Sequence, residues 1–142
     1  MRQFIVGRTH QHPTVSHTGS DAPAIADSLT YTWGQWNTDA MVYTDNTLVL
    51  YSTGEWTLQN RARNGSRSST WWVTMTFQAV GNATGAVIWL HDPEAWAGKF
   101  NIGYEETKSA SGADDKIKNT WDDLVSGKVL MQLLSTVEEV ET

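Results

Sequence analysis

Tryptophan, arginine, threonine and glutamine side chains alternate with apolar ones along residues 55–91. This alternation has the two-residue period of a β-strand, so the polar and aromatic set shares one face of a predicted sheet. Indole rings stack on sugar rings or planar ligands, and guanidinium groups hold hydroxyl or carboxylate oxygens with paired donors. We therefore expect a recognition surface made of Gln59, Arg61, Arg63, Trp72, Thr74, Trp89 and His91, extended by Trp36 from a neighbouring turn.

A purely structural interpretation of the same face stays open. In it, Arg63 only covers Trp72 on a solvated sheet, as a cross-strand pair worth about 0.2–1 kcal/mol. The eight tryptophans cannot all contact a ligand. Four of them are assigned to the hydrophobic core: Trp33, Trp56, Trp71 and Trp121.

A histidine next to acidic residues follows the last of these strands. His91 precedes Asp92 and Glu94, and a histidine beside a carboxylate in a cleft is suited to acid–base catalysis. His12, in a loop near the start of the chain, is a second candidate. In an enzyme, His91 and His12 would be the catalytic residues. A turn formed by Asp92 and Pro93 explains the first pattern without catalysis.

Three histidines in one predicted loop are weak candidates for metal ligands: His10, His12 and His17. Imidazoles bind transition metals, usually together with a carboxylate, and Asp27 is near in the sequence. A surface loop that happens to hold three histidines explains the pattern equally well. We expect no metal and no other cofactor.

The composition limits the classes of partner. The chain has 142 residues, which suits one domain over 1–142, and a net charge of −6. This charge argues against nucleic acid and anionic membrane as partners, while a homo-oligomer remains compatible with it. The absence of cysteine excludes disulfides and favours a reducing compartment. We expect a cytoplasmic protein, or one released without a signal peptide, because the first residues form no long apolar run.

Seven to nine short strands separated by turn residues predict an all-β antiparallel meander, either a single β-barrel or a two-sheet sandwich. One short helix is expected near 114–125, where apolar residues have helical spacing and Gly127 gives a stop. The final strand is expected to begin at Val129. A helix over 122–134 is the competing interpretation. Residues 10–27 are expected to form a long loop, and 40–43 and 47–51 two strands separated by a turn at Asp45 and Asn46. Residues 94–99 are expected to form a helical turn, 100–104 a strand and 109–113 a loop.

The strands over 55–63, 70–79 and 86–91 are expected to form consecutive hairpins. With their apolar sets on one face, the register predicts Arg63 opposite Trp72 and Thr76 opposite Trp89. A shift by two residues keeps the faces and changes the partners.

These features favour a small ligand-binding β-domain, a lectin-like one that binds carbohydrate through its Trp/Arg/Thr sheet face; the wider class of ligand is a small molecule or glycan. The alternative is a small cofactor-free β-barrel enzyme of the cyclase, isomerase or lyase type, with a histidine acid or base in a tryptophan-lined cavity. A third interpretation is an interaction protein, whose exposed aromatic residues are buried against another copy.

Overall fold

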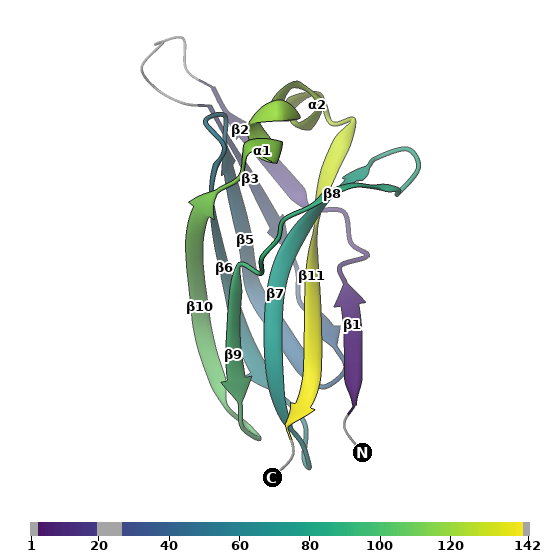
Figure 1. Cartoon of the computed structure of the whole chain (residues 1–142), viewed down its shortest axis with the longest axis vertical. Helices are drawn as coiled ribbons and strands as arrows, with labels where there is room; N and C mark the ends of the chain where they lie inside the picture. Colours follow the sequence, from purple (N-terminus) through teal and green to yellow (C-terminus); the bar gives the residue numbers. More distant parts are fainter. Residues whose placement is uncertain (1–2, 20–26, 141–142) are drawn as a thin grey trace.

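Antiparallel strands form two sheets that pack face to face in the computed structural model, which describes residues 3–19 and 27–140 (Figure 1). The five-stranded sheet consists of β1 (Phe4–Arg8), β11 (Val129–Val140), β7 (Thr70–Gly81), β8 (Val87–Leu90) and β9 (Trp96–Phe100). β11 lies between β1 and β7, and both β8 and β9 pair with the far side of β7.

The six-stranded sheet consists of β10 (Glu105–Ala113), β6 (Glu55–Asn64), β5 (Met41–Tyr51), β3 (Ser28–Trp33), β2 (Thr14–Thr18) and β4 (Trp36–Thr38). The strands follow in the order β10, β6, β5, β3, β2, and β4 pairs with β5 beside β3. The all-β prediction is confirmed, and of the two architectures left open the sandwich fits the structure.

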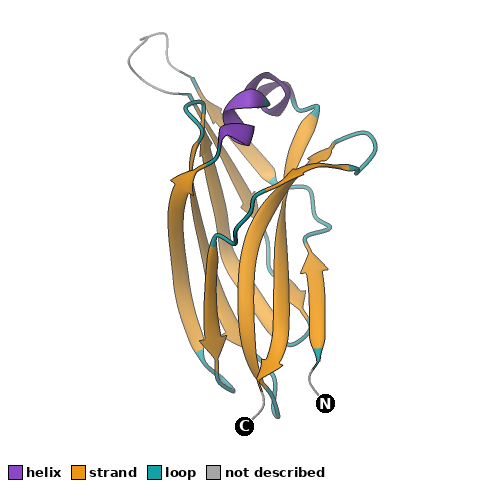
Figure 2. Cartoon of the chain, viewed as in Figure 1, coloured by secondary structure: helices purple, strands orange, loops and turns teal. Residues whose placement is uncertain are grey.

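Two short helices, α1 (Asp115–Asn119) and α2 (Trp121–Ser126), lie at one end of the sandwich between β10 and β11 (Figure 2). The prediction of one helix over 114–125 is therefore corrected to two, which meet at Thr120. Gly127 ends α2 with a φ of 82°, a left-handed conformation that glycine adopts without strain. This stop excludes the competing helix over 122–134, and β11 begins at Val129 as predicted. No helix in the described ranges has both the length and the apolar character needed to cross a membrane.

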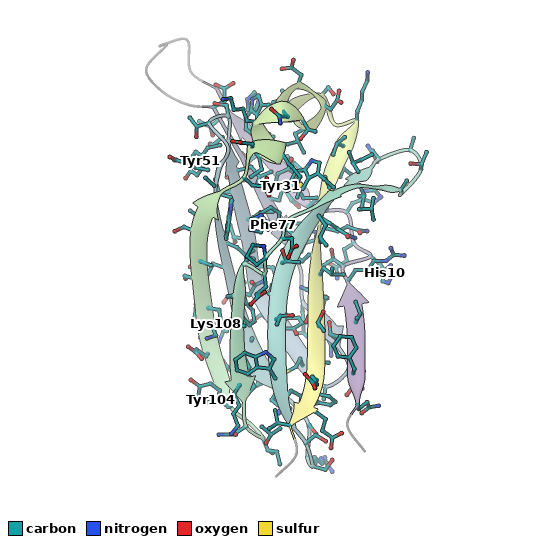
Figure 3. The ribbon with its side chains drawn as sticks, in the orientation of Figure 1. His10, Tyr31, Tyr51, Phe77, Tyr104 and Lys108 are labelled. Atoms are coloured by element: carbon teal, nitrogen blue, oxygen red, sulfur yellow. The ribbon has the colours of Figure 1, made fainter. Side chains whose placement is uncertain are left out.

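The core lies between the sheets and follows from the two-residue period. β6 alternates exposed and buried residues along its whole length, with Trp56, Leu58 and Ala62 buried as predicted. From the opposite sheet, Trp71 and Phe77 on β7 are buried against them, and the Phe77 ring, labelled in Figure 3, meets the Trp56 ring edge-on.

The predicted register of the central hairpins is wrong. β6 and β7 belong to different sheets, because residues 65–69 cross from one layer to the other. Arg63 is opposite Glu105, while Trp72 is opposite Glu138. Trp89 lies opposite Ala79 rather than Thr76.

A register shift between Ala79 and Val80 reverses the predicted faces of β8. A slip of one residue moves every side chain of a strand to the other face. Trp89 therefore points into the core, and Leu90 is exposed.

Five local predictions are also corrected. Residues 40–43 and 47–51 belong to one strand, β5, in which a bulge replaces the expected turn at Asp45. Most of the helical turn expected over 94–99 belongs to β9, and the loop expected over 109–113 is the second half of β10. Of the expected strand over 100–104, Phe100 ends β9 and residues 101–104 form the connection to β10. Part of the predicted loop over 10–27 is the edge strand β2, and the remainder includes residues outside the described ranges.

Candidate functional site

The residues predicted to form one recognition surface lie in three separate places. Gln59, Arg61 and Arg63 are exposed on the outer face of the six-stranded sheet. Trp72 and Thr74 are on the outer face of the other sheet, across the thickness of the sandwich. The remaining three are buried: Trp36, Trp89 and His91.

The outer face of the six-stranded sheet carries two rows of side chains that run across five strands; we call them the hydroxyl rows. The first row is Thr14, Thr32, Thr47, Gln59 and Ser109. The second row is Ser16, Thr30, Val49, Thr57 and Ser111. Every position except Gln59 and Val49 bears a hydroxyl group. Neighbours within a row are about 4.7–4.9 Å apart, which is the spacing between hydrogen-bonded strands.

A shallow groove of about 420 Å³ runs over the part of these rows that lies on β5, β6 and β10. Its lining residues are Thr47, Thr57, Leu58, Gln59, Ser109, Ala110 and Ser111. None of them is charged. Charged side chains flank the rows. Arg61, the outward residue that follows Gln59 on β6, donates a hydrogen bond to Glu105, and Glu55 precedes Thr57 on the same strand. Asp45 is exposed at the bulge of β5.

Sequence reasoning missed most of these residues, because β2 and β10 lack apolar alternation. Both are edge strands, so their side chains are largely exposed and their composition is typical of loops. One signal was available: threonine and serine recur at alternate positions, as in the segments 14–18, 28–32 and 107–111.

Trp72 is 44% exposed on the opposite face of the sandwich. It is flanked by Glu138 on β11 and Lys99 on β9, and Phe4 follows Glu138 in the same row. This outer surface is more apolar than that of the six-stranded sheet. Val6, Val87 and Leu90 on it are also exposed.

His91 and Asp114 form a buried pair beneath the helical end of the sandwich. The His91 Nδ1 atom lies 2.7 Å from the Asp114 Oδ2 atom, and each side chain is less than one-tenth exposed. The His91 ring stacks on Phe77, with ring centroids 4.6 Å apart, and meets the edge of Trp56 at 4.9 Å. These contacts fix the orientation of the imidazole.

Asp114 is also the N-cap of α1. Its Oδ1 atom accepts a hydrogen bond of 2.9 Å from the backbone N–H of Lys116, and the ammonium of Lys116 lies 3.3 Å from the same atom. Burial acts to raise the pKa of Asp114. The hydrogen bonds from His91 and Lys116, with the charge of Lys116, outweigh burial and lower the pKa. The pair borders a surface hollow of about 460 Å³, whose lining also includes Asp92, Pro93 and Asn119.

Trp36 belongs to a buried polar network that connects strands of both sheets. Its indole Nε1 donates to Asn46 Oδ1 at 3.3 Å, and the same oxygen accepts from Asn60 Nδ2 at 2.7 Å. The indole of Trp96, from the other sheet, donates to Asn60 Oδ1 at 2.8 Å. Trp36 is therefore part of the buried interior and does not lie on the predicted recognition surface. No pattern in the sequence predicts that Asn46 and Asn60 point inward as its partners.

The three histidines near the N-terminus do not gather in one place. His10 and His12 line a small hollow beside β11, whereas His17 lies on β2 with its Nε2 atom 3.6 Å from Asp27 Oδ2. Within the described residues, no group of three or more histidine, cysteine, aspartate or glutamate side chains is arranged to hold a metal ion.

The fold and this site define the class of the protein as a β-sandwich with a neutral, hydroxyl-lined sheet face. Comparison with protein-family models and with curated protein sequences gives no match for the chain.

Proposed function

We propose that the chain is a small ligand-binding domain that recognises a neutral, polyhydroxylated ligand, most simply a carbohydrate chain, on the outer face of its six-stranded sheet. The observation that carries this proposal is the pair of hydroxyl rows with the groove over Thr47, Thr57 and Ser109. Of the residues predicted from sequence, Gln59, Arg61 and Arg63 belong to this face.

The chemistry of the rows suits a sugar. A hydroxyl group both donates and accepts, so serine and threonine match the hydroxyl groups of a sugar in either role. Threonine is branched at Cβ and restricted at χ1, so its hydroxyl is held in few orientations before the ligand arrives. The spacing between strands is close to the length of one pyranose ring, so a chain lying across the strands meets a new side chain with each sugar. Gln59, the fourth of the five residues in the first row, adds an amide donor and acceptor.

Other partner classes fit this face less well. Protein interfaces are enriched in aromatic residues, methionine and arginine at an apolar centre, whereas the centre here consists of small hydroxyl side chains. Nucleic acids and anionic membranes require clustered positive charge, and the rows carry none. The two arginines of this face, Arg61 and Arg63, lie outside the rows on β6, and Arg61 is paired with Glu105.

The proposal is tested by measuring the binding of soluble neutral oligosaccharides by calorimetry, after a glycan array has selected the strongest binder. Replacing both Thr47 and Thr57 by valine keeps the shape of each side chain and removes its hydroxyl. We expect a loss of affinity of at least tenfold. Thr74→Val makes the same change on the opposite sheet and is the matched control; it should leave the affinity unchanged. Equal effects of the two changes, or no binder at all, would overturn the proposal.

The pair of His91 and Asp114 favours a second candidate function, acid–base catalysis in the hollow that the pair borders. The carboxylate fixes one ring nitrogen, an arrangement that orients a histidine base in many enzymes. A catalytic base must exchange protons with solvent near neutral pH. This candidate is tested by following the ring nitrogens of His91 by NMR between pH 5 and 8. Titration of the ring in this range supports it, and a ring that keeps one protonation state throughout excludes it.

A further inference from the structure

Strand β11 extends past the end of its neighbour β1. The ladder between the two strands continues one residue beyond β1, where the Thr9 N–H donates to the Leu133 carbonyl at 3.0 Å. The Leu133 N–H in turn donates to the Thr9 side-chain hydroxyl at 3.0 Å. After Thr9 the chain turns away toward β2, and His10 lies beside this part of β11, just beyond the tip of β1 (Figure 3).

Met131 is the residue of β11 at which the next pair of hydrogen bonds in this ladder would form. Odd-numbered residues of β11 direct their backbone groups toward β1, as the bonds of Leu133 and of Glu139, whose N–H donates to the Gln3 carbonyl, show. Lys128 directs its carbonyl the other way, toward Asn82. By the two-residue period, the N–H and C=O of Met131 point to the side that β1 leaves open.

No residue in the described part of the chain pairs with Met131 on that side. Met131 is 0% exposed. More than about nine-tenths of buried backbone groups in proteins have a hydrogen-bond partner in the protein or in ordered water, so this open position in the ladder is available to a partner from outside the chain.

A hollow of about 160 Å³ lies at this position. His10 and His12 line it, and so does Gln132. The Gln132 Oε1 atom accepts from Gln78 Nε2, and its amide N–H groups remain for another acceptor. Val80 contributes an apolar wall. No acidic residue is among the lining residues, although the chain has a net charge of −6.

We propose that this hollow binds a small α-amino acid, which completes the ladder at Met131. In an antiparallel ladder, two opposed residues exchange both of their backbone bonds. The carboxylate of the ligand accepts from the Met131 N–H, and its ammonium donates to the Met131 carbonyl. The imidazoles of His10 and His12, with the amide of Gln132, serve the second carboxylate oxygen. The small volume favours side chains of the size of glycine, alanine or serine.

The proposal is tested by titrating the full chain, labelled with nitrogen-15, with L-alanine and following backbone amides by NMR. We expect the Met131 amide to shift with saturation. Acetate and methylamine, which each supply one half of the recognised group, should bind at least tenfold more weakly than alanine. An acetylated, amidated alanine tests whether a residue within a peptide, rather than a free amino acid, is the source of the ligand; it should bind more weakly, because it lacks both charges.

Variants connect the binding to this hollow. His10→Ala and His12→Ala should each weaken alanine binding at least threefold. His17→Ala, which removes an imidazole outside the hollow, should leave it unchanged. An unchanged Met131 amide in the presence of alanine would show that only water occupies the position and would overturn the proposal. Acetate binding as tightly as alanine, tighter binding of the capped alanine, or equal effects of all three variants would also overturn it. Each result is independent of carbohydrate binding on the outer sheet face.

Discussion

The hydrogen bond between His91 and Asp114 fastens the end of β8 to the start of α1. The two atoms that it joins, Nδ1 and Oδ2, are 2.7 Å apart in a nearly dry environment. His91 follows β8, which belongs to the five-stranded sheet, and Asp114 follows β10, the edge strand of the six-stranded sheet. The bond connects the two sheets at this end. It therefore holds the helical end of the sandwich closed.

His91→Ala is expected to destabilise the fold. The change removes this bond and the stacking on Phe77, and leaves the Oδ2 atom of the buried Asp114 carboxylate without its partner. We expect a loss of about 2–3 kcal/mol in the free energy of unfolding, typical of a lost hydrogen bond to a buried charged group. Urea denaturation measures it. His17→Ala, at an exposed site, should change the value by less than about 0.5 kcal/mol. An unchanged midpoint for His91→Ala would contradict the role given to the pair.

Stability should fall in acid partly through Asp114. The pKa of this carboxyl is lowered from its ordinary value of 3.8 in the folded protein. A lowered pKa contributes stability that is fully present above the unfolded value and is lost as the pH falls through the folded value. As the pH is lowered below 4, the free energy of unfolding should therefore fall less steeply in Asp114→Asn than in the unchanged chain. Parallel curves for the two proteins would show that Asp114 does not contribute.

Gly112 is expected to tolerate no side chain. A Cβ atom at this position would lie 2.9–3.1 Å from three atoms of the Trp56 indole, which itself packs on His91. Gly112→Ala should therefore displace Trp56 and reduce the free energy of unfolding by about 1–3 kcal/mol, as overpacked cores do. Ser111→Ala, the adjacent outward position, should have little effect on stability. Urea denaturation measures both variants. Equal denaturation midpoints would show that the Trp56 indole moves aside without loss of stability, which would contradict the prediction.

The buried network predicts coupling between Asn60 and Trp96. Asn60→Leu leaves the indole N–H of Trp96 without its acceptor, at a cost of about 1–3 kcal/mol. Trp96→Phe removes the donor, so the double variant should lose less stability than the sum of the single variants. A double-mutant cycle in urea measures this difference. Strictly additive losses would show that the bond contributes nothing.

The two-residue period in the sequence predicted the core well. Trp56 and Leu58 on β6, and Trp71 and Phe77 on β7, are buried as expected, because each strand places one face against the opposite sheet. Alternation of this kind is a local property, and a short window of sequence contains it.

The arrangement of the candidate site could not be predicted in the same way. Alternation shows which residues share a face, but not which strands are neighbours; the connection over 65–69 crosses between sheets instead of forming a hairpin. A register shift at Ala79 and Val80 then turned Trp89 inward. The hydroxyl rows arise only when five strands are placed side by side, three of which are distant in sequence from Thr57.

The central claim is that the outer face of the six-stranded sheet is the recognition surface, and mapping of amide chemical shifts with a bound neutral oligosaccharide tests it most directly. We predict that the residues that shift will cluster on β5, β6 and β10, around Thr47, Thr57 and Ser109. Shifts confined to the surroundings of Trp72 on the opposite sheet, or no saturable shifts with any oligosaccharide, would contradict it.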